Sequence, residues 1–184
     1  PGQIPLALHS LGADLYTGAC HKWMMAPKGA AFLYARPEVQ EMLDPLVVSW
    51  GYESEYPSGS QFIDYHEWQG TRDLAAFLSV PAAIEFQESN RWDEVRQACH
   101  TLASQTRERL NTITGEAPIC PDSPEWFGQM FAARLPEGIA AKSLVNRLYE
   151  DHRIEVATTA WNDQNFLRVS FQGYNNQEDA DALI

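Results

Sequence analysis

Two lysines stand close together in a stretch of small and apolar residues, YTGACHKWMMAPKGAAFLYA, which covers residues 16–35. Lys22 lies between His21 and Trp23, and Lys28 follows a proline further along. Such surroundings suggest burial, and at Lys22, expected at a strand end beside an aromatic residue, the amine could point into a cleft. Desolvation lowers the pKa of an amine, which makes it a nucleophile toward a carbonyl group. The stretch therefore predicts a Schiff-base lysine at Lys22.

The alternative for Lys22 is an ordinary surface lysine. Its stem would cover apolar neighbours while the ammonium stays in water, which is the more common arrangement for an arbitrary lysine. The local order of a strand, a glycine turn and then His21, Lys22 and Trp23 favours the chemical interpretation. Lys28 is interpreted as a solvated loop charge.

A hydroxyl in the sequence GTRD is a candidate for binding phosphate. Thr71 follows a glycine and precedes a predicted helix, whose N-terminus would present donors and a positive dipole end to an anion. In the alternative, Thr71 and Asp73 are only helix caps.

A guanidinium in the sequence LRVS is a candidate for binding a carboxylate. Arg168 can hold a carboxylate with two parallel hydrogen bonds, which fixes the orientation of the ligand. An arginine that alternates with Leu167 and Val169 on a strand is, taken alone, more often a surface or ion-pair residue.

The elements that must position these groups change character along the chain. Short apolar runs at 13–19 and 29–36, bounded by Gly and Pro, predict buried strands, so Lys22 is expected on the loop between them. A third strand is predicted at 46–52, followed by a turn-rich loop at 55–61. Residues 74–89 have helical spacing, with a kink or break at Pro81.

The second half of the chain alternates helices and strands. A small α+β domain is predicted there, with a boundary near Ser89, so that the domains are 1–88 and 89–184. The predicted elements are a helix at 92–113, a strand at 126–135, a helix at 140–152, strands at 153–159 and 165–174, and a final helix.

Composition limits the partners. The chain has 184 residues and a formal net charge of −12, which argues against nucleic acid or an anionic membrane as a partner, because either requires a basic surface. Small molecules and proteins remain. Cys20, Cys99 and Cys120 have wide, unrelated spacings that suggest neither a disulfide framework nor a metal site, and a reducing cytoplasm fits best.

The ends of the chain are unusual. It begins PGQIPLALHS without a methionine and ends NNQEDADALI in a pattern typical of an unfinished helix, so a piece of a longer protein is expected. No apolar run approaches the roughly 20 residues that span a bilayer.

Three segments in this order, GADLYTGACHKWMMAPKGAAFLY, WQGTRD and FLRVSFQGYNN, resemble the class V aminotransferase family of fold-type I pyridoxal-phosphate enzymes, and within it the isopenicillin N epimerase-like branch. The resemblance covers nearly the whole chain. It implies an α/β fold, in which this chain is the end of the large cofactor-binding domain, 1–88, followed by the small α+β domain, 89–184.

The resemblance also implies roles for individual residues. Lys22 matches the lysine that carries pyridoxal 5'-phosphate as an internal aldimine and later moves the α-proton, whereas Lys28 does not match it. Thr71 matches a residue that reaches the cofactor phosphate of the neighbouring subunit of a homodimer. Arg168 matches the clamp for the substrate α-carboxylate. His21 is a candidate for positioning the cofactor or relaying protons, or is structural.

Two departures from the family pattern matter. The aspartate that pairs with the pyridine nitrogen and the residue that stacks on the ring would both lie upstream of this chain, so the chain alone should be catalytically poor or inactive. The loop before Arg168 also lacks the nucleophilic cysteine of the cysteine desulfurases of this class, which disfavours persulfide chemistry.

One lysine can serve epimerisation, elimination and transamination alike, so the residues do not choose among them. The resemblance alone favours epimerase-like or lyase-like activity on an amino acid over transamination. A rival of another class is a non-catalytic dimerisation or interaction module derived from the same fold. Trp50 and Trp68 are candidates for lining the pocket, although large aromatics are usually core residues.

Overall fold

The computed structural model describes residues 1–184 and divides into two compact units, 1–86 and 87–184. Each unit is described by itself. The predicted boundary at 88/89 lies close to this division, which falls within one helix, α5 (Val80–Ser89).

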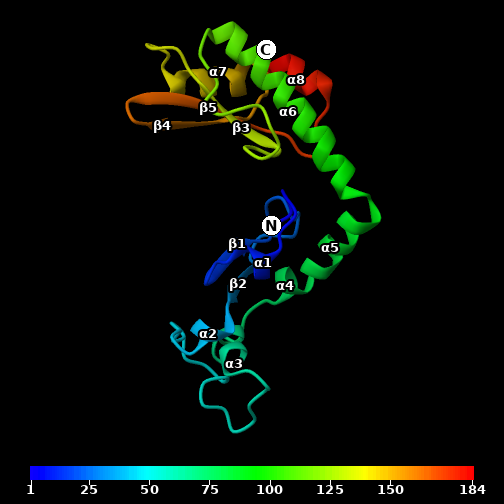
Figure 1. Cartoon of the computed structure of the whole chain (residues 1–184), viewed down its shortest axis with the longest axis vertical. Helices are drawn as coiled ribbons and strands as arrows, with labels where there is room; N and C mark the ends of the chain where they lie inside the picture. The colour runs from blue at the N-terminus through cyan, green and yellow to red at the C-terminus, as the bar shows by residue number, and fades with distance from the viewer. The chain divides into compact units, whose positions relative to one another are not determined.

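The first unit is built around an antiparallel strand pair, β1 (Leu15–Ala19) and β2 (Ala31–Ala35), which confirms the two predicted strands. The two strands lie side by side as an isolated ribbon (Figure 1). Five helices complete this unit: α1 (Leu8–Leu11), α2 (Pro37–Gln40), α3 (Gln61–Glu67), α4 (Ala75–Leu78) and most of α5.

The third strand predicted at 46–52 is wrong, because this segment forms a loop. Val47 and Val48 are exposed and have no partner strand. The chain instead packs against α3 at Gly51, where an added Cβ would lie 1.8 Å from the carbonyl oxygen of Asp64. Only a residue without a side chain allows that approach.

The helix predicted at 74–89 is interrupted, as expected from Pro81. It forms α4 and α5 with a break at Ser79, and Pro81 becomes the second residue of α5. A proline in the first turn of a helix costs little, because that turn does not use its N–H.

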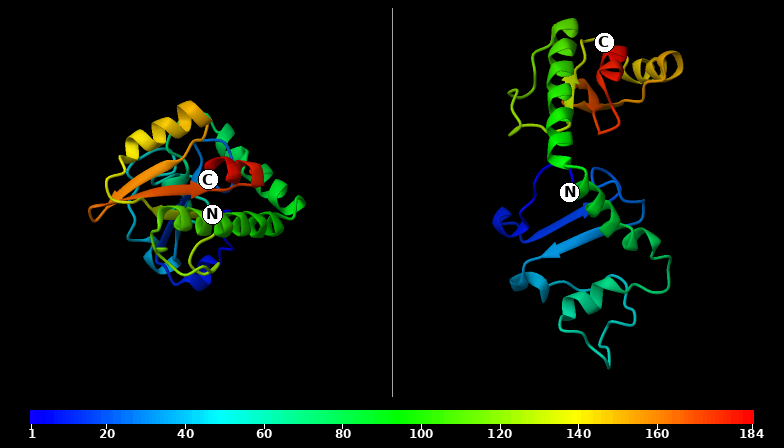
Figure 2. Two further views of the ribbon diagram at one scale, coloured as in Figure 1. Left: turned by 90° about the horizontal axis from the view of Figure 1, so that it is seen from above. Right: turned by 90° about the vertical axis from the view of Figure 1, so that its right-hand side faces the viewer.

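The second unit pairs three antiparallel strands in the order β3-β5-β4. The helix α6 packs against the edge strand β3, and α7 contacts β4 and β5. The long helix α6 is drawn in green in Figure 2. The elements are α6 (Trp92–Thr114), β3 (Met130–Arg134), α7 (Ala141–His152), β4 (Ala157–Trp161), β5 (Gln164–Ser170) and α8 (Gln177–Leu183).

The predicted order of elements in this half is confirmed, but β4 begins later than expected. Arg153 adopts a left-handed conformation, with φ of 60°, and its N–H caps the end of α7. Residues 153–156 are therefore used to turn the chain. The core comprises Leu167, Val169 and Phe171 from β5 and its continuation, packed with Cys99, Ala103, Leu110, Phe131, Ala133 and Ala180.

None of the helices combines the length and the apolar character that crossing a membrane requires.

Candidate functional site

Lys22 lies on the loop between β1 and β2, as the sequence predicts. The N–H of Cys20 donates to the carbonyl of Ala30, and the N–H of Ala26 donates to the carbonyl of Cys20, both at 3.0 Å. Within this closed loop, Lys22 opens a tight turn in which the N–H of Met25 donates to its carbonyl at 3.0 Å, and Met25 has a φ of 61°.

Small residues anchor this loop to the rest of the unit. The buried side chains of Cys20, Ala26 and Ala30 pack against α4 and α5 through Ala76, Phe77, Val80 and Ala83. Gly29, with a φ of +117°, approaches so closely that an added Cβ would lie 3.2 Å from the Cβ of Ala76. The loop position therefore depends on close contact between small side chains.

The burial expected of Lys22 is wrong, whereas the interpretation of Lys28 as a solvated loop charge agrees with its exposure. Lys22 and Lys28 are both exposed, and neither forms an ion pair or a side-chain hydrogen bond in this structure. His21 is exposed as well, and only Trp23 is half-buried. The apolar residues of the stretch face the helices, so the desolvation inferred from its composition is not provided by this loop.

The N-terminal residues brace the same loop. A Cβ added at Gly2 would lie 2.6 Å from the carbonyl carbon and oxygen of Trp23, and one added at Gly18 would lie 2.7 Å from the ring of Pro1. Gly2 thus packs on the backbone next to Lys22, and Pro1 packs on β1 just before the loop.

Thr71 is exposed, and the structure corrects the expected helix geometry around it. The following helix, α4, has only four residues and begins at Ala75, so Thr71 lies outside its first turn. Asp73 provides the local hydrogen bond instead, accepting from the N–H of Ala75 at 2.8 Å. The preceding turn is ordered by Arg72, which donates to Gln69 at 2.9 Å and lies over the ring of Phe77.

The loop of Lys22 and the segment after Thr71 belong to the same hydrophobic cluster, because α4 and α5 pack on residues 20–30. The first unit therefore brings these two stretches together, although they are far apart in the sequence. Trp50 and Trp68 are not core residues, since 85% and 38% of their surfaces are exposed.

Arg168 lies in the second unit, on the central strand β5. It stands opposite Ala132 of β3 and Ala157 of β4. Both neighbours are small, and the side chain of Arg168 is exposed without an ion pair or a hydrogen bond. Leu167 and Val169 point to the core, so the strand fixes Arg168 on the opposite face.

One further arginine on this face escaped the sequence analysis. Arg134 is paired with Phe166, which lies two residues before Arg168 on β5. The two arginines therefore lie on the same face of the sheet. The alternation in MFAARL was available in the sequence, but the register between β3 and β5 was not.

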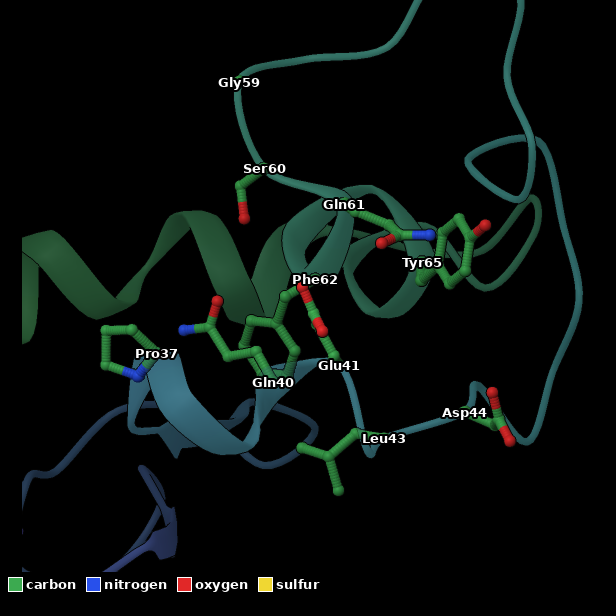
Figure 3. A pocket seen from close by; sticks show the side chains of 10 residues that line it. All are labelled: Pro37, Gln40, Glu41, Leu43, Asp44, Gly59, Ser60, Gln61, Phe62 and Tyr65. Atoms are coloured by element: carbon green, nitrogen blue, oxygen red, sulfur yellow. The ribbon is translucent and has the colours of Figure 1, made fainter.

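A polar hollow of about 310 Å³ lies elsewhere in the first unit, between α2 and α3. Gln40 and Phe62 approach each other at its wall, and Tyr65 lies on its other side (Figure 3). None of the predicted site residues lines it. Neither short helix was predicted from the sequence, so no sequence pattern indicated this hollow.

The connection before Arg168 is short. Asn162 and Asp163, with φ values of 50° and 59°, form a two-residue turn between Trp161 of β4 and Gln164 of β5. Two left-handed residues are typical of a type I′ hairpin, which leaves no room for a longer loop at this point.

Known proteins resemble the chain along its whole length. An isopenicillin N epimerase of Amycolatopsis lactamdurans is 38% identical over 100% of this chain and 48% of the relative. The Streptomyces clavuligerus protein of that name is 35% identical with the same coverage. A probable chloroplastic L-cysteine desulfhydrase of Arabidopsis thaliana is 31% identical over 99% of this chain and 41% of the relative. The chain thus spans about half the length of these relatives.

Solved structures have the same fold. The cystine C-S lyase C-DES, in complex with cysteine persulfide, superposes with a TM-score of 0.78 at 20% identity, covering 99% of this chain and 48% of the lyase. A C-DES variant with glycine covalently linked to the PLP cofactor gives a TM-score of 0.79 at 19% identity, with coverage of 99% and 47%.

The fold is therefore that of the pyridoxal-phosphate enzymes of class V, of which this chain covers about half. The sequence model described as "Aminotransferase class-V" matches residues 2–183. Pyridoxal 5'-phosphate is the cofactor that this match implies. Since the match extends over almost every residue, the chain belongs to the class V aminotransferase family.

Proposed function

We propose that this chain is the C-terminal half of a homodimeric enzyme that uses pyridoxal 5'-phosphate to act at the α-carbon of an amino acid. The observation that carries the proposal is the match of the class V family model to almost the whole chain, within which Lys22 is presented at the head of a turn on an anchored loop. The amine forms no ion pair or hydrogen bond, so no group of the chain blocks its access to an aldehyde.

The chemistry of the available groups fits the cofactor. The Nζ of Lys22 would hold it covalently at its aldehyde carbon, and the exposed hydroxyl of Thr71 would contact the phosphate held by a partner subunit. His21 stands next to Lys22 and would help to orient it. When bound, the cofactor supplies an electron sink that stabilises negative charge at the substrate α-carbon.

In the proposed reaction, the Nζ of Lys22, once free of the cofactor, would act as the general base. Lys22 then removes the proton from the substrate Cα and returns a proton later. Arg168 holds the substrate α-carboxylate through two hydrogen bonds from its guanidinium, and so decides which Cα bond faces the cofactor. Its unpaired state in the structure supports this role.

We further propose epimerisation or elimination as the reaction, ahead of transamination. The similarity to epimerases at 35–38% identity and to a probable desulfhydrase at 31% supports this order. Persulfide formation on an enzyme cysteine is disfavoured, because the two-residue turn at Asn162 and Asp163 carries no thiol.

Reduction with borohydride tests the lysine assignment. The complete protein that contains this chain is incubated with cofactor, reduced and digested, and its peptides are analysed by mass spectrometry. A phosphopyridoxyl group on Lys22, together with loss of the visible absorption band, is the expected result. An adduct on Lys28, or a complete protein that takes up no cofactor, would refute the proposal; the second outcome would favour the non-catalytic module.

The reaction is distinguished by its products. With an L-amino acid in deuterated water, an epimerase gives the D-enantiomer labelled at Cα, a lyase gives a keto acid and ammonia, and an aminotransferase requires a second keto acid. Strict dependence on that second substrate would overturn the order proposed here.

A further inference from the structure

The face of the second unit's sheet that carries Arg168 carries a second arginine. In the register of β3 and β5, Arg168 is opposite Ala132 and Arg134 is opposite Phe166, so the two arginines are diagonal neighbours on one face. The Cα atoms of such neighbours are roughly 7–8 Å apart, a separation that the long side chains of two arginines can bridge to one small ligand.

Neither arginine has a partner in the chain. Five other arginines form ion pairs, namely Arg36, Arg91, Arg96, Arg107 and Arg109. Arg134 is half-buried, and its Nε is buried without a hydrogen-bond partner. The terminal nitrogens of its guanidinium also form no hydrogen bond or ion pair, so they remain available to an acceptor from a ligand.

The surroundings favour an anion. The residues paired around the two arginines are small, apolar or hydroxylated: Met130, Ala132, Ala157, Thr159, Phe166 and Ser170. None is acidic, although the chain as a whole has a net charge of −12. Glu155, which precedes β4, forms no ion pair with either arginine.

We propose that Arg134 binds a second carboxylate of the substrate, so that the enzyme acts on amino acids with another carboxylate beyond the α-carbon. This inference rests on the proposed role of Arg168 as the clamp of the α-carboxylate. Arg168 is exposed and Arg134 is half-buried, so both guanidinium groups are open to a ligand on this face of the sheet.

The specificity follows from the cost of an unpaired charge. A substrate with a single carboxylate leaves the guanidinium of Arg134 without an anionic partner, whereas a dicarboxylate supplies an acceptor for each guanidinium. The enzyme therefore selects by the second carboxylate through the difference between a paired and an unpaired arginine.

Calorimetric titration of the complete protein tests the inference, with adipate and hexanoate as probes that differ by one carboxylate. The wild-type protein should bind adipate at least about tenfold more tightly than hexanoate, a ratio typical of one hydrogen bond to a charged group. Arg134→Gln should abolish this preference and leave hexanoate binding nearly unchanged. Arg168→Gln should weaken both probes.

Arg147→Gln is the matched control, because Arg147 is an exposed arginine of α7 in the same unit without an ion pair. It should leave the binding of both probes as in the wild type. A variant Arg134→Lys, which keeps the charge but loses the planar fork, should retain part of the preference and serves where Arg134→Gln does not fold.

Two results would overturn the inference. One is a wild-type protein that binds both probes equally. The other is an equal loss of both probes in Arg134→Gln, which would mean that Arg134 helps Arg168 to hold the same carboxylate. Borohydride labelling of Lys22 in the same preparations separates the two proposals: a normal adduct without a dicarboxylate preference refutes only the inference, and an absent adduct refutes the proposed function.

Discussion

The lysine loop, residues 20–30, and the arginine strand β5 position their functional groups by different means. The loop is closed by a few backbone hydrogen bonds and anchored by the small side chains of Cys20, Ala26 and Ala30. The strand lies between two neighbours, so its register is fixed along both edges. The position of Lys22 therefore depends on local packing, whereas that of Arg168 depends on a whole sheet.

The difference has a physical consequence for substitution. A change of volume beneath the loop can displace Lys22 without unfolding the unit, because few backbone hydrogen bonds close the loop and its position depends on the packing of small side chains. A shift of Arg168 would require β5 to slip by two residues to keep its core face, which would break pairing with both neighbours. Four substitutions probe this contrast, from the largest expected effect to the smallest.

Removal of the amine should have the largest effect. Lys22→Ala in the complete protein should lower turnover by about 10²–10⁴-fold or more, because both the proposed covalent anchor and the proposed general base are lost. Steady-state kinetics with saturating cofactor measure the change. Lys28→Ala is the control, since Lys28 is exposed on the same loop. Equal losses in the two variants would place the function in the loop as a whole.

Replacement of the planar guanidinium should have the next largest effect. Arg168→Lys keeps the charge but cannot make two parallel hydrogen bonds to one carboxylate, so KM should rise by about tenfold or more. Since Arg168 is exposed, the melting temperature should change little. Arg147→Lys should alter neither quantity. A large fall in melting temperature with unchanged KM would show that Arg168 is structural.

Overpacking beneath the loop tests its dependence on small residues. Ala26 is 6% exposed, and Ala26→Leu should cost about 1–3 kcal/mol of stability and also reduce turnover, because the loop must move to accommodate the larger side chain. Ala82→Leu on the exposed side of α5 should have neither effect. Urea unfolding and kinetics measure the two quantities. Unchanged turnover with lowered stability would mean that the loop is more rigid than its contacts suggest.

The smallest effect is expected from a buried thiol in the second unit. Burial raises the pKa of Cys99, against an opposing hydrogen bond from Gln129. As the pH rises, the unfolded chain therefore loses the Cys99 proton at a lower pH than the folded chain does. The contribution of Cys99 to stability is fully present below the ordinary thiol pKa and declines as the pH rises above about 8.5. Urea unfolding at pH 7 and pH 10 should show a smaller decline in Cys99→Ala than in the wild type. Parallel declines would contradict this assignment.

Much of the fold could be predicted from local pattern. The strands around Lys22, the long helix α6 and the strand of Arg168 each have a period or a boundary residue that the chain encodes within a few positions. The failures occurred where a non-local contact overrode that pattern. Residues 46–52 have a strand-like composition, but Gly51 packs on Asp64 and no strand lies beside them.

The candidate site was predictable in its residue types but not in its environment. The apolar residues around Lys22 suggested burial, yet their side chains pack on α4 and α5 and the lysine is exposed to solvent. Composition reports which residues are neighbours in sequence, whereas exposure depends on which way each side chain points. Likewise, the helix expected at 74–89 begins with a single turn, α4, so Thr71 lies four residues before its first residue, Ala75.

By itself, the sequence determined the family and the cofactor that the family implies, and it predicted roles for Lys22, Thr71 and Arg168, because these depend on motifs in chain order. Only the tertiary structure decided that Arg134 shares a face with Arg168 and that Lys22 is exposed. Strand register and side-chain exposure are properties of contacts between distant segments. The residues of a single strand or loop do not specify which distant segment will pack beside it.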